Sequence, residues 1–319
     1  MKKFLVSGGA GLIGSHITER LLRDGHEVTV LDNLITGQRD NLTFCASHPH
    51  FTFLERDITE DCSDLYEGGW DYILHLASPA SPVDYAMLPL ETMRVGSVGT
   101  ENMLEIARHS GARILFSSTS EVYGDPDVHP QKEDYNGNVS CTGTRSCYDE
   151  AKRYSEALMC TYHRVYKVDI RIARIFNTYG PRNRENDGRV VPNFMLQVLQ
   201  GQPLTVFGTG KQTRSFCYVG DMVEGLLSLL FSDVTGPVNL GNPAEFTILE
   251  LAELLQELGG IELPVTFEPL PHEDDPRRRC PDITRAKTLL GWEPKVHPRE
   301  GMALTMEYYR ERLASRSGE

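Results

Sequence analysis

Two residues of this sequence have the types and the spacing needed for hydride chemistry. Tyr148 and Lys152 are four positions apart and so share one face of a helix. There the ammonium group is expected to lower the pKa of the phenol, so that the phenolate can take a proton from a substrate hydroxyl as hydride leaves the carbon. Ser120 and Glu121, earlier in the chain, add a hydroxyl and a carboxylate that indicate which step follows this oxidation.

Three glycines near the start of the chain have the spacing of a dinucleotide-binding loop. Gly8, Gly11 and Gly14 give GxxGxxG between a predicted strand and a predicted helix, where backbone NH groups and the helix N-terminus can face a pyrophosphate. Asp32 ends the next predicted strand, where a carboxylate can accept hydrogen bonds from an adenosine ribose. Because no arginine follows Asp32, the sequence favours NAD over NADP.

Short runs rich in β-branched and aromatic residues alternate with stretches of helical apolar spacing. The predicted strands are residues 4–7, 27–31, 51–55, 71–76, 113–117 and 169–175. The predicted helices between them include residues 12–23, 90–109 and 148–165. This alternation predicts an α/β fold built on a Rossmann-type doubly wound parallel sheet.

A smaller α/β substrate domain is expected to be interwoven with the first. Residues 177–189 are rich in Gly, Pro, Asn and charge and predict a long functional loop. Beyond it we expect helices at residues 190–200, 248–258 and 301–313, a strand at 204–207, and a strand followed by a helix within 215–231. Residues 1–175 and 217–240 are assigned to the NAD-binding domain, and residues 176–216 and 241–319 to the substrate domain.

The composition restricts the partners that the chain can have. Of its 319 residues, 40% are apolar and 24% are charged, which predicts a large buried core. A formal net charge of -13 argues against nucleic acid and anionic membranes as partners, so an anionic ligand must be met by local basic residues such as those at 277–279. No apolar run approaches the length that spans a bilayer.

Cysteines and histidines give no motif for a metal site. The seven cysteines form no CxxC pair and are odd in number, which fits a reducing cytoplasm better than a disulfide framework or a zinc site. His75 ends an apolar strand and is expected to be a hydrogen-bonded core residue, while the other nine histidines have no ligand spacing. We therefore expect no metal.

The order of these motifs matches a known superfamily. With the glycine loop, Asp32, Thr119, Tyr148 and Lys152 in sequence, the chain resembles the extended short-chain dehydrogenases/reductases. The resemblance continues through residues 174–182, 212–221 and 274–283 and so covers nearly the whole length. Within the superfamily, residues 75–82, 118–126 and 147–150 are similar to the UDP-glucuronate decarboxylases, also called UDP-xylose synthases.

The pair Ser120-Glu121 supports this subfamily on chemical grounds. Sugar-nucleotide 4,6-dehydratases carry an Asp-Glu pair here, in which one acid protonates the departing C6 hydroxyl and the other removes the C5 proton. This chain has Ser120 in place of the first acid, whereas a glucuronosyl substrate has no C6 hydroxyl to expel. The 4-epimerases usually lack an acid at the position of Glu121 as well. A retained acid without its partner fits decarboxylation.

The resemblance implies a reaction in three steps. Tyr148 removes the C4 hydroxyl proton while hydride passes from C4 to NAD, which leaves a β-keto acid. Loss of CO2 from C6 then gives an enolate that is stabilised by Tyr148 and the hydroxyl of Thr119. Protonation at C5 and return of the hydride give the pentosyl product and restore NAD. Lys152 is expected to hold the nicotinamide ribose, and Glu121 to manage protons at C5 or at the sugar ring.

The resemblance also implies which residues touch the ligands. The expected catalytic residues are Thr119, Glu121, Tyr148, Lys152 and Arg279. The expected cofactor-binding residues are Gly8, Gly11, Leu12, Ile13, Gly14, Asp32, Asn33, Asp57, Ile58, Leu76, Ala77, Ser117, Tyr148 and Lys152. The expected substrate-binding residues are Pro79, Ser81, Tyr85, Glu121, Arg145, Asn177, Arg182, Val191, Arg214, Tyr218 and Arg277.

The substrate carries two kinds of negative group, a carboxylate and a diphosphate, and the arginines are assigned to one or the other. A tight pair between arginine and the substrate carboxylate would stabilise the ground state more than the transition state and so oppose loss of CO2. Arg182, Arg214 and Arg277 are therefore assigned to the diphosphate, where bidentate geometry suits them. Arg279 aligns with an arginine that related decarboxylases place near the reacting sugar, for positioning or proton donation.

Other functions stay open at this point. Residues 141–146 depart from the decarboxylase pattern near the sugar, and nothing plainly distinguishes a uridine from a thymidine nucleotide. A 4-epimerase, a 4,6-dehydratase or a catalytically silent NAD-binding sensor are the alternatives, although a sensor has no need of a polarised phenol. The helices at residues 90–109 and 148–165 are expected to pair across a homodimer.

Overall fold

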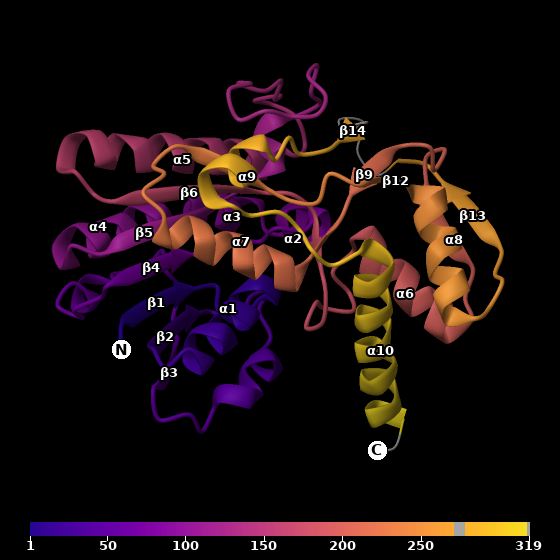
Figure 1. Cartoon of the computed structure of the whole chain (residues 1–319), viewed down its shortest axis with the longest axis horizontal. Coiled ribbons are helices and arrows are strands. Elements are labelled where there is room, and N and C mark those ends of the chain that lie inside the picture. Colours follow the sequence, from indigo (N-terminus) through magenta and orange to yellow (C-terminus); the bar gives the residue numbers. More distant parts are fainter. Residues whose placement is uncertain (271–277, 318–319) are drawn as a thin grey trace.

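A seven-stranded parallel sheet forms the larger part of the computed structural model, which describes residues 1–270 and 278–317 (Figure 1). Its strands, in spatial order, are β3 (Phe51–Glu55), β2 (Glu27–Asp32), β1 (Lys3–Ser7), β4 (Tyr72–His75), β5 (Arg113–Thr119), β6 (Ile170–Ile175) and β11 (Pro237–Leu240). The order reverses between β1 and β4, so the loops that follow these two strands diverge and open a crevice at the carboxyl edge of the sheet. The predicted Rossmann-type α/β fold is confirmed.

Helices cover both faces of this sheet, because its strands are apolar on both sides. In β1, Leu5 packs into the core on one face and Val6 into the core on the other, as the two-residue period of a strand requires. The face of Val6 is covered by α1 (Leu12–Arg23) and α7 (Val219–Phe231), with α9 (Thr284–Leu290) beside β11. The face of Leu5 is covered by α4 (Thr100–Ser110) and α5 (Ser146–Tyr166).

The single helix expected at residues 90–109 is wrong in one respect. The chain there forms α3 (Pro89–Arg94), a π-helical turn η3 (Val95–Gly99) and then α4. Gly96 packs against α5 so closely that a Cβ atom would lie 2.7 Å from that of Ala151. Ser155 of α5 donates a hydrogen bond to the Gly96 carbonyl at 2.7 Å. The wider turn frees this carbonyl, which sequence periodicity does not reveal.

A second unit lies on the other side of the molecule in Figure 1 and has its own core. Three helices, α6 (Val190–Gln200), α8 (Ile248–Gly259) and α10 (Pro298–Ser317), pack with the parallel pair β8 (Leu204–Phe207) and β13 (Val265–Glu268). The helices and the strand at 204–207 are where the sequence predicted them. Phe194, Leu251 and Met306 join the three helices in one apolar cluster.

Short strands join the two units. One small sheet has β9 (Thr213–Ser215) between β12 (Glu245–Thr247) and β14 (Arg278–Arg279), and another pairs β7 (Thr178–Tyr179) with β10 (Cys217–Tyr218). The short helical segments elsewhere are η1 (Arg39–Cys45), η2 (Ser63–Leu65), α2 (Pro82–Met87) and η4 (Ser120–Tyr123). The predicted domain boundaries stay a prediction. Ile283, Ala286 and Trp292, which these boundaries place in the second unit, pack in the core of the first.

Within residues 1–270 and 278–317, none of the helices combines the length and the apolar character needed to cross a bilayer.

Candidate active site

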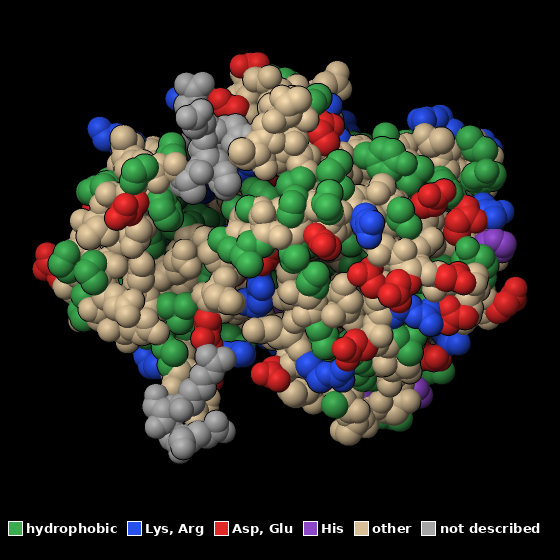
Figure 2. All heavy atoms as spheres, turned by 180° about the vertical axis from the view of Figure 1, so that it is seen from behind, with side chains coloured by type: hydrophobic (Ala, Val, Ile, Leu, Met, Phe, Trp, Pro, Cys, Tyr) green, Lys and Arg blue, Asp and Glu red, His purple; other side chains and the backbone are tan. Residues whose placement is uncertain are grey.

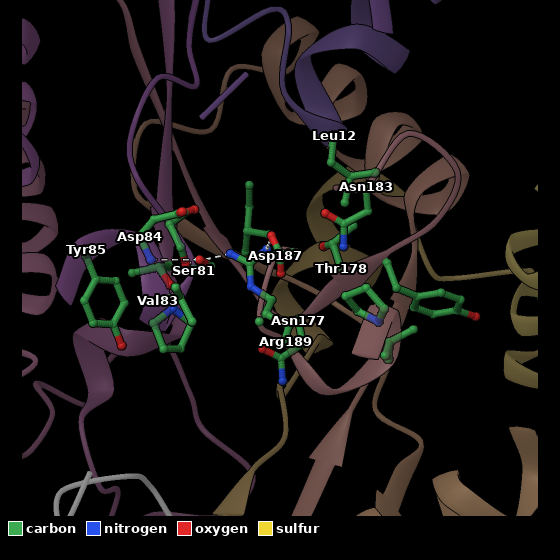
Figure 3. Close-up of a pocket in the computed structure, with 18 of the residues that line it drawn as sticks. Leu12, Ser81, Val83, Asp84, Tyr85, Asn177, Thr178, Asn183, Asp187 and Arg189 are labelled. Atoms are coloured by element: carbon green, nitrogen blue, oxygen red, sulfur yellow. Dashed lines mark hydrogen bonds and ion pairs between the residues drawn. The ribbon is translucent and has the colours of Figure 1, made fainter. Parts of the chain in front are cut away.

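A cavity of about 740 Å³ opens between the carboxyl edge of the large sheet and the second unit. Figure 3 shows its wall, with side chains of α2 on one side and of the loop at residues 177–189 on the other. The structure brings most of the predicted site residues to this wall. They are Gly8, Gly11, Leu12, Ile13, Gly14, Leu76, Ser81, Tyr85, Ser117, Thr119, Glu121, Arg145, Tyr148, Lys152, Asn177, Arg182, Val191, Arg214 and Arg279.

The glycine loop has no room for side chains. Gly8 has φ +76°, and a Cβ atom there would lie 2.6 Å from the Ala77 backbone nitrogen. A Cβ atom at Gly14 would lie 2.2 Å from the Gly8 carbonyl oxygen. The loop is thus folded tightly over the start of α1, and its backbone forms part of the cavity wall. This is the form that a phosphate-binding turn requires.

A smaller hollow of about 150 Å³ adjoins the glycine loop and contains the predicted adenosine contacts. Asp32, Asn33, Asp57, Ile58 and Ala77 line it. Pro79, which was predicted to contact the substrate, lines this hollow and not the larger cavity. The Asp32 carboxylate accepts hydrogen bonds from the backbone of Ala10 and Leu34, both at 2.9 Å. Burial nevertheless raises the pKa of Asp32.

Asp57 is held in place beside this hollow by its neighbours. Burial disfavours its charge, but hydrogen bonds from Thr59 and from the Asn33 amide, the latter at 2.9 Å, outweigh this effect and lower the pKa of Asp57. Both carboxylates are therefore oriented before a ligand arrives, since each is fixed by donors from a neighbouring loop.

The phenol and the lysine lie together on α5, as their spacing predicts. Tyr148 and Lys152 are both buried, and the ammonium nitrogen of Lys152 is 5.8 Å from the centre of the Tyr148 ring. Lys152 donates a hydrogen bond of 2.8 Å to the carbonyl oxygen of Ser117, at the end of β5. Thr119, two residues further on, forms a hydrogen bond with Tyr148 that favours the phenolate.

The expected lowering of the Tyr148 pKa by Lys152 is wrong for the chain alone. Burial raises the pKa of Tyr148 to about 12, and the hydrogen bond with Thr119 only partly opposes this effect. Burial also lowers the pKa of Lys152 to about 7, so the lysine is itself only partly charged near neutral pH. Desolvation, which the spacing of the two residues does not reveal, disfavours the charged form of both groups.

Glu121 is a buried carboxylate that is held between two buried arginines. Arg279 donates to it at 2.8 Å, and Arg145 donates to the same oxygen. Burial disfavours its charge, but Arg279, Arg145 and Arg214 together outweigh this effect and lower the pKa of Glu121. The carboxylate is therefore ionised, which makes it a poor proton donor and a firm anchor for both guanidinium groups.

Two predicted substrate contacts come from the far side of the cavity. Arg182 donates to Glu19 of α1 and stacks 4.5 Å from the centre of the Phe44 ring, while its buried Nη1 atom has no hydrogen-bond partner. Arg214 is buried on β9 and donates at 2.9 Å to the Thr213 carbonyl. These positions leave positive charge at the cavity wall of a protein whose net charge is -13.

Tyr85 and Ser81 come from the segment of α2. Tyr85 stacks on Tyr148 with ring centres 5.1 Å apart, and its buried hydroxyl has no hydrogen-bond partner. Ser81 caps α2 by accepting a hydrogen bond from the Asp84 backbone at 3.1 Å. The serine thus fixes the start of the helix that holds Tyr85 against the phenol.

One predicted substrate contact is not brought to the site. Tyr218 lines neither hollow and instead packs edge-on against Tyr179, with ring centres 5.9 Å apart. Arg277 lies outside the described residues.

Sequence reasoning missed Arg189, which Figure 3 places on the cavity wall. Its guanidinium donates at 2.6 Å to the Ala80 carbonyl and lies close enough to Tyr148 to favour the phenolate. Arg184 of the same loop pairs with Asp84 of α2. In the sequence, the charged character of residues 177–189 indicated a functional loop. It did not indicate which arginines of this loop point into the cavity.

His75 is the hydrogen-bonded core residue that the sequence predicted. It lies between Ser7 at 2.9 Å and Thr100 at 3.1 Å. Burial lowers its pKa to about 3, so it is neutral.

Comparison with known proteins assigns a class to this fold and site. The family model described as the NAD dependent epimerase/dehydratase family matches residues 4–241. The structure is similar to a UDP-glucose 4-epimerase from Thermotoga maritima, solved with UDP-glucose, with a TM-score of 0.90 and 32% identity over 98% of this chain and 99% of that one. It is also similar to a UDP-glucuronic acid 4-epimerase from Bacillus cereus, solved with NAD and a fluorinated UDP-sugar acid, with a TM-score of 0.89 and 28% identity over 97% and 99% of the two chains. The chain belongs to the NAD dependent epimerase/dehydratase family.

A closer group within this family is defined by sequence. The chain is 55% identical to UDP-glucuronic acid decarboxylase 5 of Arabidopsis thaliana over 313 residues, which are 98% of this chain and 90% of the relative. It therefore belongs to the UDP-glucuronic acid decarboxylases, as the resemblance of its motifs implied.

Proposed function

We propose that this chain converts UDP-glucuronate to UDP-xylose and CO2 by oxidation at C4, decarboxylation and reduction. The observation that carries the proposal is the Glu121 carboxylate, which is buried between Arg145 and Arg279 and has Ser120 as its neighbour. The identity of 55% with a UDP-glucuronic acid decarboxylase over 98% of the chain supports the same reaction.

NAD fits the residues that line the two hollows. The glycine loop leaves space that any Cβ atom at Gly8 or Gly14 would fill, which suits close approach of a pyrophosphate. Asp32 presents a fixed carboxylate at the smaller hollow, where a ribose would receive two acceptor oxygens and a 2′-phosphate would meet a like charge. When bound, NAD supplies the acceptor and later the donor of a hydride.

Tyr148 is the base for the first step. Its phenol has to lose a proton to take one from the C4 hydroxyl, and the groups of this chain that favour the phenolate are Thr119 and Arg189. Once the C4 ketone has formed, the phenol and the hydroxyl of Thr119 can donate hydrogen bonds to the oxygen that becomes negative as CO2 leaves. A proton that comes from solvent takes the place of CO2 at C5, and the phenol returns its own proton to the C4 oxygen as the hydride returns to C4.

Loss of CO2 fits this site better than loss of water. Expulsion of a hydroxyl from C6 needs an acid, and Glu121 is held ionised by its arginines while Ser120 cannot serve. A β-keto acid needs no acid at C6, since its electrons flow into the C4 ketone. Arg145 and Arg279 are already paired with Glu121, so they are not free to clamp the substrate carboxylate, which would oppose its loss.

The test is a direct assay of the product. The purified protein is incubated with UDP-glucuronate and NAD, and the sugar nucleotide is analysed by mass spectrometry. Loss of the mass of CO2 is expected. Loss of the mass of water would indicate a dehydratase, an unchanged mass with an altered sugar an epimerase, and no reaction a silent NAD-binding sensor. A parallel assay with the thymidine analogue tests the choice of base.

The expected homodimer is supported by apolar side chains on two neighbouring helical segments. Leu90 and Met93 of α3 are 69% and 48% exposed, and Tyr154 of α5 is 51% exposed. α3 and α5 pack side by side, and we call these exposed apolar side chains the α3–α5 surface. Figure 2 shows a face of the molecule on which hydrophobic side chains lie among acidic and basic ones. In the proposed homodimer, these two helical segments of one subunit pack against the same two segments of a second copy of the chain.

A further inference from the structure

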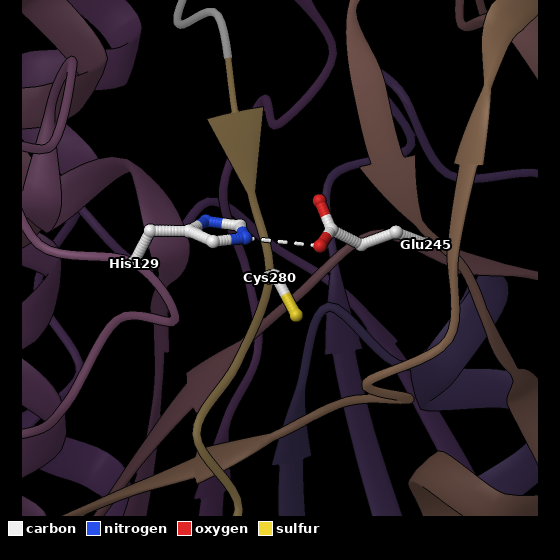
Figure 4. A group of neighbouring side chains, drawn as sticks. All are labelled: His129, Glu245 and Cys280. Carbon is white, nitrogen blue, oxygen red and sulfur yellow. Dashed lines mark hydrogen bonds and ion pairs between the residues drawn. The ribbon is translucent and has the colours of Figure 1, made fainter.

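Three side chains from distant parts of the chain meet outside the active site. His129, Glu245 and Cys280 have their imidazole, carboxylate and thiol donor atoms within 4.8 Å of one another (Figure 4). The histidine Nε2 atom lies 2.9 Å from a carboxylate oxygen of Glu245, although these residues are 116 positions apart. Because the three segments are so far apart in sequence, no motif spacing could have revealed the cluster.

Each of the three positions is fixed by its own structural support. Glu245 begins β12, and its second carboxylate oxygen accepts a hydrogen bond of 2.7 Å from Thr213 of β9. Cys280 follows β14, and its backbone NH donates to the side chain of Gln131 at 2.8 Å. Gln131 returns a backbone hydrogen bond of 2.9 Å to the Cys280 carbonyl, which ties the segment of His129 to that of Cys280. The donors are therefore placed before any ligand arrives.

The donor set has the chemistry of a zinc site. Imidazole nitrogen, carboxylate oxygen and thiolate sulfur are the three ligand types that zinc uses, and three protein ligands leave a fourth position for water. We propose that His129, Glu245 and Cys280 bind one Zn²⁺ ion. A hard cation such as Mg²⁺ or Ca²⁺ would leave the thiol unused, since it takes oxygen ligands.

Access and charge are consistent with an exchangeable ion. The side chains of His129 and Glu245 are each 28% exposed, so an ion can enter from solvent, while Cys280 is buried beneath them. Because the sulfur binds as thiolate, the bound ion has to be one with high affinity for thiolate, and zinc is such a cation.

Cobalt provides the experiment, because Co²⁺ reports its ligands by absorption. The purified holoprotein is titrated with Co²⁺. One equivalent is expected to give a sulfur-to-cobalt charge-transfer band and the visible bands of a tetrahedral site, and Zn²⁺ is expected to abolish both. Cys280→Ser should lose the charge-transfer band, and His129→Ala and Glu245→Gln should each weaken Co²⁺ binding at least about 10-fold.

Two controls separate this site from adventitious binding. Cys141 is the exposed cysteine of the described residues, so Cys141→Ser should leave the titration unchanged. Zn²⁺ should raise the unfolding midpoint of the unaltered protein and not that of Cys280→Ser. Glu245→Gln keeps an acceptor for Thr213, which guards against a folding defect. Absence of a charge-transfer band from the unaltered protein, or its persistence in Cys280→Ser, would overturn the proposal.

Discussion

Arg279 donates a hydrogen bond of 2.8 Å to the carboxylate of Glu121, a residue 158 positions earlier in the chain. Glu121 follows β5 of the large sheet, whereas Arg279 lies on β14 of the small sheet that joins the two units. Their contact closes the cavity between the units, with Arg145 of α5 completing the pair from a third direction. The charge balance of the active site therefore depends on the packing of the two units.

Replacement of Glu121 by glutamine tests this balance. Glu121→Gln removes the buried carboxylate that Arg145 and Arg279 share, so we expect a loss of stability of about 3–5 kcal/mol together with a strong loss of decarboxylation. Urea unfolding and the product assay measure the two effects. Glu257→Gln, at an exposed pair of α8 with Arg299 of α10, is the matched control and should change stability by less than about 1 kcal/mol. Equal effects of the two replacements would contradict the role given to Glu121.

Replacement of Tyr148 by phenylalanine removes the proposed base. We expect Tyr148→Phe to lower CO2 release by about 10²–10⁴-fold while NAD binding is retained. Tyr162 lies on the same helix, is buried and bonds to Glu105 at 2.8 Å, so Tyr162→Phe should leave turnover nearly unchanged. Labelled CO2 release and NAD titration give the two readouts. Normal turnover of Tyr148→Phe would remove the proposed mechanism.

Lys152 is expected to lower the stability of the folded protein, although the reaction requires it. Its pKa falls from 10.5 to about 7 because it is buried, so the fold disfavours the charged form. Lys152→Met should therefore stabilise the protein without NAD by roughly 1–3 kcal/mol after loss of the hydrogen bond to Ser117, while turnover falls. The gain should be full below pH 7, should shrink as pH rises toward 10.5 and should vanish above it. Urea unfolding across this range checks the sign, and a gain that grows with pH would contradict the assignment.

Asp32 is expected to set both the affinity and the choice of cofactor. Asp32→Ala removes charge-assisted hydrogen bonds to a ribose and should weaken NAD binding about 10–100-fold. It should also bring the affinities for NAD and NADP closer together, since the like charge facing a 2′-phosphate is gone. Calorimetric titration with each cofactor measures both. The control is Glu55→Ala. Glu55 lies on the neighbouring strand β3 and forms an exposed pair with Arg39, so this variant should bind NAD normally.

The α3–α5 surface gives a prediction for the homodimer. Met93→Glu puts a charge among the exposed apolar side chains of this surface, so we expect it to shift a dimer toward monomer in size-exclusion chromatography with light scattering. Leu304 is 49% exposed on α10, a helix that packs with α6 and α8 of the second unit, and Leu304→Glu should not change the mass. A monomeric unaltered protein would refute the dimer.

Sequence alone identifies the parts of the molecule that depend on local patterns. The strand at 51–55 and the helices at 12–23 and 190–200 have the predicted bounds, because β-branched runs and apolar spacing determine them. The glycine loop and the pair Tyr148–Lys152 are likewise local motifs. These elements bring most of the expected site residues to one cavity.

Features that depend on tertiary packing were not predictable. Desolvation raises the Tyr148 pKa where spacing alone suggested a decrease. Arg189 enters the site through the fold of a loop whose charges all look alike in sequence. The π-helical turn at Gly96 depends on a close contact with α5. This contact joins distant parts of the chain, since the hydrogen-bonded residues Thr100 and Ser155 are 55 positions apart.

Transfer of deuterium from C4 tests the central claim of transient oxidation most directly. UDP-glucuronate carrying deuterium at C4 is incubated with the protein and unlabelled NAD, and the UDP-xylose is analysed by mass spectrometry and NMR. The account predicts release of CO2, a slowed reaction and deuterium still at C4 of the product, because the same hydride leaves and returns. CO2 release with no isotope effect on the single-turnover rate and no deuterated reduced cofactor during turnover would contradict it.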